Sequence, residues 1–227
     1  MVEGLYEVFG RVPRPGRVEG CSHCVAPDED RVLLGRPVRE LEPEVLARYA
    51  AKALSTWGGV AEFRYFLPRL LECAAADAFV YPDPPVVFGK LAKAGWTEWD
   101  AEERGAIEVF LSEWWDRTLE RFPSRPAVGT VLCSLGCTGI GVGSFLERWE
   151  RLASDEAIRH LHEFVLHEVG WGPQPRLVDA YWGRDGREVV GWLTGGRAVA
   201  AVEAAFARED REYVLRLLDE VHTTLDR

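Results

Sequence analysis

The sequence predicts an all-α protein on three observations. Apolar residues recur at helical spacing from residue 40 onward. Gly and Pro separate these periodic stretches, and no segment alternates as a strand does. We therefore expect one domain over residues 40–227, a HEAT-like stack of roughly eight to ten antiparallel helices, behind an irregular N-terminal arm over residues 1–39.

The first elements follow from Pro, Gly and apolar spacing. A helix is expected to begin near Pro43, because Pro suits a first helical turn, and to end at Trp57–Gly59. The next covers residues 60–76, whose apolar positions form one broad face. Pro68 lies inside that pattern and should kink or split the helix. Residues 81–85 are rich in Pro and break the chain.

The same reasoning extends to the C-terminus. Ser154 predicts a helix N-cap, because its hydroxyl accepts a hydrogen bond from the first turn. Trp149 and Trp192 lie 43 residues apart, which fits the two-helix period of HEAT repeats. A break is expected near residues 208–210. The further helices expected are 86–95, 100–122, 128–135, 145–152, 155–169, 176–182, 187–194 and 197–225, the last as one helix or a pair.

Length and composition place the chain among ordinary globular proteins. Its 227 residues are 47% hydrophobic and 28% charged. A net charge of −10 argues against nucleic acid and anionic membranes as partners. No apolar run reaches the roughly 18 residues of a membrane helix, and the first residues do not form a signal peptide. We therefore expect a cytoplasmic protein. Its 24 Arg against 3 Lys, with no Asn, indicate a GC-rich bacterial genome, so the Arg excess is weak evidence for anion recognition.

The clearest chemical motif is Cys21-x-x-Cys24, with His23 between the two cysteines. Two thiolates at this spacing hold one tetrahedral zinc ion when two more ligands are supplied. The possible further ligands are Cys73, Cys133, Cys137, His160, His162 and His167. A redox pair with a transient disulfide, or two ordinary loop thiols, are the alternatives. Thioredoxin-type chemistry is not expected, because its motif opens a helix after a strand.

Three other patterns favour structural roles. Cys133 and Cys137 share a helical face, where buried Cys packs as a small apolar side chain. His162 and His167 stand five residues apart, so they do not share a face as the histidines of a His-Glu-x-x-His zinc site do. The glycines of residues 139–143 lack the strand that precedes a nucleotide-binding loop. No catalytic residue is predicted.

An aromatic groove is the second candidate site. It would be lined by Trp57, Arg64, Tyr65, Trp96 and Trp99. Aromatic anchors with a few polar groups are common where peptides or small molecules bind. Large aromatic side chains also fill gaps between packed helices, and both interpretations stay open.

The chain resembles a group of uncharacterised all-α proteins from bacteria with GC-rich genomes. The likeness rests on Pro13–Pro15, Gly20–Cys24, Thr56–Gly58 and Phe63–Glu72, and it spans most of the chain. It implies an all-α cytoplasmic protein and transfers no activity.

We expect a protein-interaction or adaptor module that binds another protein, because the helices carry no complete catalytic constellation. The alternatives are a zinc-binding protein centred on Cys21 and Cys24, and a small-molecule binding protein or enzyme that uses the aromatic groove. The oligomeric state is left open.

Overall fold

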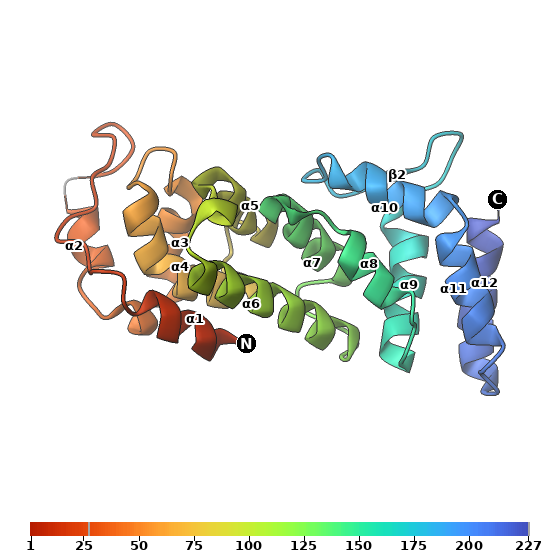
Figure 1. Cartoon of the computed structure of the whole chain (residues 1–227). Coiled ribbons are helices and arrows are strands. Elements are labelled where there is room, and N and C mark those ends of the chain that lie inside the picture. The colour runs from red at the N-terminus through yellow and green to blue at the C-terminus, as the bar shows by residue number, and fades with distance from the viewer. Residues whose placement is uncertain (27, 227) are drawn as a thin grey trace. The chain divides into compact units, whose positions relative to one another are not determined.

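The computed structural model describes residues 1–26 and 28–226, and in this part of the chain it confirms the all-α class (Figure 1). Twelve α-helices and one two-stranded sheet are found in the described residues. The chain divides into two compact units, Met1–Trp114 and Trp115–Arg227, and the boundary falls within helix α6. The sequence analysis placed a boundary only after residue 39.

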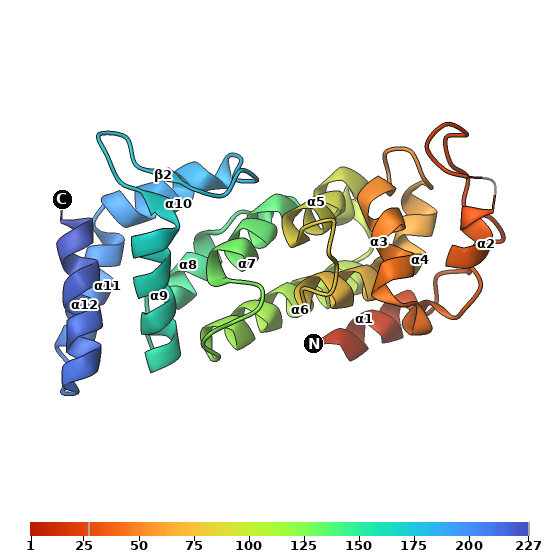
Figure 2. The same ribbon diagram turned by 180° about the vertical axis from the view of Figure 1, so that it is seen from behind.

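The described residues of unit 1 form five α-helices, two 3-10 turns and the first part of helix α6. Four of them, α1, α3, α4 and α5, pack against one another (Figure 2). The elements are α1 (Val2–Phe9), α2 (Glu29–Leu33), the 3-10 turn η1 (Val38–Glu40), α3 (Pro43–Lys52), α4 (Val60–Ala75), α5 (Pro84–Ala94), the 3-10 turn η2 (Trp96–Glu98) and α6 (Ala101–Leu119).

Helix α4 supplies much of the unit 1 core. Its broad apolar face is buried as predicted, with Phe63, Phe66 and Leu70 fully enclosed. The predicted split at Pro68 does not occur, because α4 runs unbroken through that residue. Pro68 is itself buried, so the packing of its ring compensates for the helical hydrogen bond that its missing N–H cannot make.

The N-terminal arm is more regular than expected, because it begins with helix α1. Leu5 and Phe9, four residues apart, are buried on one face of α1. Tyr6 donates a hydrogen bond to Glu72 of α4 at 2.7 Å. A single buried apolar pair is enough to hold a short helix against its neighbour. In the sequence, however, one such pair is too short a pattern to predict a helix.

Unit 2 is built around aromatic side chains. Trp149 is fully buried, and its ring centroid lies 5.5 Å from Trp115, 5.5 Å from Phe164 and 5.6 Å from Trp192. The elements are α7 (Val128–Leu135), the π-turn η3 (Gly136–Ile140), α8 (Gly143–Trp149), α9 (Asp155–His167), β1 (Val169–Gly170), β2 (Arg176–Leu177), α10 (Asp185–Thr194), α11 (Arg197–Phe206) and α12 (Glu212–Leu225).

The predicted helix over residues 176–182 is absent from the structure. Arg176–Leu177 instead forms β2, which pairs antiparallel with Val169–Gly170. Residues 170–175 contain two Gly and two Pro, which favour a turn that returns the chain alongside β1. The Ser154 cap is confirmed, since the Ser154 hydroxyl accepts the Ala157 N–H at 3.2 Å. The break near residue 210 is also confirmed, because α11 ends at Phe206 and α12 begins at Glu212.

None of the individual helices in the described residues has the length and apolar composition to cross a membrane. The bent pair of α10 and α11 meets that requirement only when the two are taken together.

Candidate functional site

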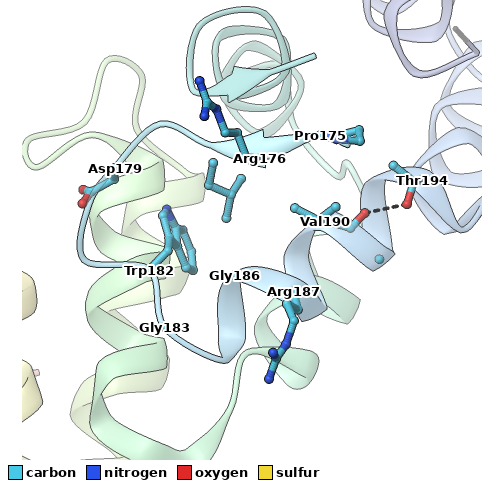
Figure 3. A pocket seen from close by; sticks show the side chains of 11 residues that line it. Pro175, Arg176, Asp179, Trp182, Gly183, Gly186, Arg187, Val190 and Thr194 are labelled. Atoms are coloured by element: carbon cyan, nitrogen blue, oxygen red, sulfur yellow. Dashed lines mark hydrogen bonds between the residues drawn. The ribbon is translucent and has the colours of Figure 1, made fainter. Parts of the chain in front are cut away.

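One candidate site is a pocket of about 480 Å³ in unit 2, between β2, the following loop and helix α10 (Figure 3). Trp182 stands on one side of the opening, and Val190 and Thr194 of α10 stand on the other (Figure 3). The full lining is Pro175, Arg176, Leu177, Asp179, Trp182, Gly183, Gly186, Arg187, Val190, Gly191 and Thr194.

Helix α10 has two faces with different tasks. Val189, Trp192 and Leu193 are buried and anchor the helix in the unit 2 core. The opposite face turns Val190, Gly191 and the other α10 lining residues toward the pocket, at helical spacing. The pocket therefore has one wall that is held rigidly by the aromatic core.

Two glycines keep the pocket open. A Cβ added at Gly186 would lie 3.1 Å from the Cβ of Trp182, so this glycine permits the close approach of the Trp182 loop to α10. A Cβ added at Gly191 would meet no atom within 4 Å. The space above Gly191 is therefore pocket volume, which a larger side chain would fill.

The rim carries two exposed guanidinium groups. Arg176 and Arg187 are exposed and lie on opposite sides of the opening (Figure 3). Neither makes a side-chain hydrogen bond or an ion pair within the described residues. Other arginines of unit 2 do, since Arg148 pairs with Asp116 at 2.8 Å and Arg211 pairs with Asp155 at 2.6 Å.

The other polar groups of the pocket differ in whether they already form hydrogen bonds within the protein. Asp179 is the only acid in the lining, and it accepts the Tyr181 backbone N–H at 2.8 Å. The Thr194 hydroxyl donates to the Val190 carbonyl at 2.9 Å. The indole N–H of Trp182 has no acceptor in the part of the chain that the structure describes. The pocket thus offers a flat apolar wall, one N–H donor without an acceptor in the described residues, and two exposed cations.

The predicted aromatic groove is not assembled as an open surface. Trp57 and Trp96 are buried in unit 1, and the Trp57 indole N–H donates to the Val18 carbonyl at 3.3 Å. Tyr65 is half-buried and stacks edge-on against its neighbour Phe66. These aromatic side chains fill gaps between helices, which is the packing interpretation.

Two of the predicted groove residues contact each other, and one of them, Arg64, lines a second pocket. The Arg64 guanidinium lies 5.2 Å from the Trp99 ring centroid and lines a cavity of about 360 Å³. Arg64 is already paired, since its Nε donates to Glu103 at 3.0 Å. Burial raises the pKa of the Glu103 carboxyl, and its Oε2 has no hydrogen-bond partner. Because the Arg64 guanidinium is already paired with Glu103, it is less available to bind an anion in this cavity.

The Cys21-x-x-Cys24 segment forms a surface turn in unit 1. Cys21 and His23 are exposed, Cys24 is half-buried, and His23 Nδ1 lies 3.9 Å from the Cys24 sulfur. In the described residues, no group of three or more His, Cys, Asp or Glu side chains is placed to hold a metal ion. A zinc centre on this motif stays a prediction.

The side chains considered as further zinc ligands have other surroundings. Cys73 is buried in unit 1, and burial raises the pKa of its thiol to about 11. In unit 2, the pKa of Cys133 is raised because its thiol donates to Cys137 and is buried. His160 is buried with its Nε2 3.0 Å from the Arg121 carbonyl, and burial lowers the pKa of that ring. His162 contacts Glu220 at 2.6 Å, and His167 is exposed.

Sequence reasoning missed the unit 2 pocket for two reasons. The segment over residues 176–182 was expected to be helical, and on a helix Arg176 and Trp182 would lie on different faces. The high Arg content was attributed to a GC-rich genome, so individual arginines were weak evidence for an anion-binding site. The available signal was the concentration of Gly, Pro, Trp and Arg over residues 170–184, which is typical of an irregular binding loop.

No protein-family model, no curated protein and no solved structure matches the chain. The resemblance to helical proteins of GC-rich bacteria stays a prediction.

Proposed function

We propose that this chain is a binding protein whose unit 2 pocket takes a small organic anion, a flat apolar body that carries a carboxylate or phosphate group. The observation that carries the proposal is the combination of an apolar pocket beside Trp182 with the two unpartnered guanidinium groups of Arg176 and Arg187. It replaces the aromatic groove of unit 1 as the site of small-molecule binding.

The size and lining support a small molecule. The volume of about 480 Å³ lies within the range of about 300–1,000 Å³ that is usual for ligand pockets. Leu177, Val190 and Pro175 supply apolar contacts, and the indole face of Trp182 suits a flat ring.

The charges support an anion. A guanidinium group forms two parallel hydrogen bonds with a carboxylate or phosphate, which an ammonium cannot do. Arg176 and Arg187 outnumber the single Asp179, whose Oδ1 already accepts a backbone N–H. The pocket therefore carries positive charge on a chain whose net charge is −10.

The test uses a matched pair of probes, 1-naphthylacetate and its neutral amide, titrated calorimetrically into the full chain. We expect the carboxylate to bind at least about tenfold more tightly, because a charge-assisted hydrogen bond contributes about 1.5–3 kcal/mol. Arg176→Gln and Arg187→Gln should each reduce this preference.

The matched control is Arg184→Gln, which makes the same charge change on an exposed residue of the same loop outside the pocket lining. It should leave the affinity within about twofold of wild type, since an exposed charge beyond a contact is largely screened. Equal binding of the amide, or an equal loss in all three variants, would contradict the proposal.

The adaptor function expected from the sequence stays a second, unsupported proposal. We include a cytoplasmic location in the main proposal. It is supported by the five cysteines, which are all free, because thiols are kept reduced in the cytosol. HEAT-type pairing also stays a proposal. The stacking of Trp149 on Trp192 supports equivalent places for these two residues in unit 2.

A further inference from the structure

The chain turns back on itself between Cys21 and Cys24, which brings the two cysteines close together. The Cys21 carbonyl accepts the backbone N–H groups of Cys24 and of Val25, each at 2.9 Å. A hydrogen bond between residues three apart closes a β-turn, whose end Cα atoms lie within about 7 Å. A disulfide spans Cα atoms about 4.4–6.8 Å apart, a range that overlaps the span of such a turn, so the backbone brings the two cysteines within reach of each other.

Backbone contacts on both sides hold this turn in place. The Cys21 N–H donates to the Thr56 carbonyl at 2.8 Å. On the other side, the Cys24 carbonyl accepts Lys52 Nζ and, at 3.3 Å, Arg48 Nη2. The peptide groups are therefore tied to α3 and to the segment after it, while Cys21 stays exposed and Cys24 half-exposed.

The surroundings distinguish Cys21 from the buried thiols. The pKa of Cys21 is lowered because its sulfur accepts hydrogen bonds from the backbone N–H of His23, then from the backbone and side chain of Cys24, with Lys52 adding a favourable charge. Cys73 has the opposite environment, since burial raises the pKa of its thiol. The thiolate is the reactive form of cysteine, so the exposed Cys21 is the better nucleophile at neutral pH.

We propose that Cys21 and Cys24 form a thiol–disulfide exchange pair, in which Cys21 attacks the disulfide of a low-molecular-weight thiol compound and Cys24 resolves the product. In the first step the Cys21 thiolate forms a bond to one sulfur of the disulfide, and the other half leaves as a thiolate. In the second step Cys24 loses its proton to water and attacks the Cys21 sulfur. The second half leaves as a thiolate, and the Cys21–Cys24 disulfide remains. Two protein thiols are oxidised and one small disulfide is reduced to two thiols.

The reaction is followed on the full chain with oxidised glutathione as the probe. The reaction is quenched with acid, free thiols are alkylated, and peptides are mapped by mass spectrometry. We expect wild type to form a Cys21–Cys24 disulfide with no glutathione retained. Cys24→Ser should accumulate glutathione on Cys21, because the resolving thiol is gone. Cys21→Ser should react at least about threefold more slowly at Cys24.

Lys52→Gln separates reactivity from simple exposure. It should shift the pH profile of Cys21 alkylation to higher pH, because a positive charge near the thiolate is lost. Arg17→Gln, an exposed arginine of the same arm, is the matched control and should leave the profile unchanged.

Two results would overturn the proposal. One is glutathione retained on wild type at both cysteines without an intramolecular disulfide, which would make them independent thiols. The other is zinc that copurifies with the chain and blocks the reaction until a chelator removes it, which would make the pair a metal site. The readouts do not involve the unit 2 pocket, so this proposal and the proposed function fail independently.

Discussion

Glu168 is a carboxylate in unit 2 whose protonation is altered by folding. Burial raises the pKa of its carboxyl to about 7, Asp179 and Glu163 add repulsion, and a hydrogen bond from the Gly129 N–H opposes the rise. Its pKa in the unfolded chain is about 4.3. The folded state therefore holds the proton more tightly. This stabilises the fold fully at a pH below about 4, and the contribution is lost as the pH rises to about 7.

Glu168→Gln should remove this pH dependence, because the amide stays neutral and its oxygen still accepts the Gly129 N–H. We expect the variant to match wild type at about pH 4 and to exceed its free energy of unfolding at about pH 8, by roughly 2–4 kcal/mol. Urea unfolding at the two pH values measures the difference. The exposed Glu120→Gln, which is not among the charges that act on Glu168, is the control, and a gain of the same size at both pH values would contradict the account.

The candidate sites could be predicted from the sequence only where their residues form a recognisable motif. Cys21 and Cys24 were recognised because their spacing is a motif, and the structure adds the turn that holds them. Arg176 and Arg187 carry no motif. Their availability depends on which carboxylates lie nearby, and that is decided by tertiary packing. Trp57 and Trp96 were expected at a surface groove, yet composition alone does not separate a binding aromatic from a packing one.

At the scale of elements, helices with long apolar faces were predictable and short elements were not. The face of α4 and the cap of α9 follow from spacing and from Ser154. The strands β1 and β2 have two residues each, which is too few for alternation to appear. Helix α1 has one buried apolar pair. Such elements form because a neighbour binds them, so their own sequence contains little signal.

Ser154→Ala should lower the free energy of unfolding by about 1 kcal/mol, because the Ala157 N–H at the start of α9 loses its acceptor. Equilibrium denaturation measures it. Ser144→Ala, an exposed serine within α8 that caps nothing, should stay within about 0.5 kcal/mol of wild type. A similar loss in both variants would show that the cap is not the cause.

At the scale of the whole molecule, the sequence predicted the all-α class but not the division at Trp114–Trp115. Apolar periodicity continues through α6, so no change of composition marks the point where one unit ends. The division becomes visible only in which side chains share a core. Trp149 and its aromatic neighbours all belong to the second unit.

Trp149→Ala should destabilise unit 2 by about 3–5 kcal/mol, because it leaves a cavity and removes the indole N–H that donates to the Ala157 carbonyl. Hydrogen exchange followed peptide by peptide should show the loss of protection concentrated after residue 115. Trp99→Ala in unit 1, where the ring is half-exposed, is the control and should cost less. An equal loss of protection in both units would contradict the division.

The central claim, an anion-binding pocket beside Trp182, is tested most directly by a thermal-stability screen of small organic anions and their neutral counterparts against wild type and Gly191→Phe. A Cβ at position 191 meets no atom within 4 Å, so the phenylalanine side chain would extend into the open space above Gly191. The account predicts that compounds with a flat ring and an anionic group raise the melting temperature of wild type, and that Gly191→Phe abolishes the rise while remaining folded. A screen in which no such compound stabilises wild type, or in which the stabilisation survives in Gly191→Phe, would contradict it.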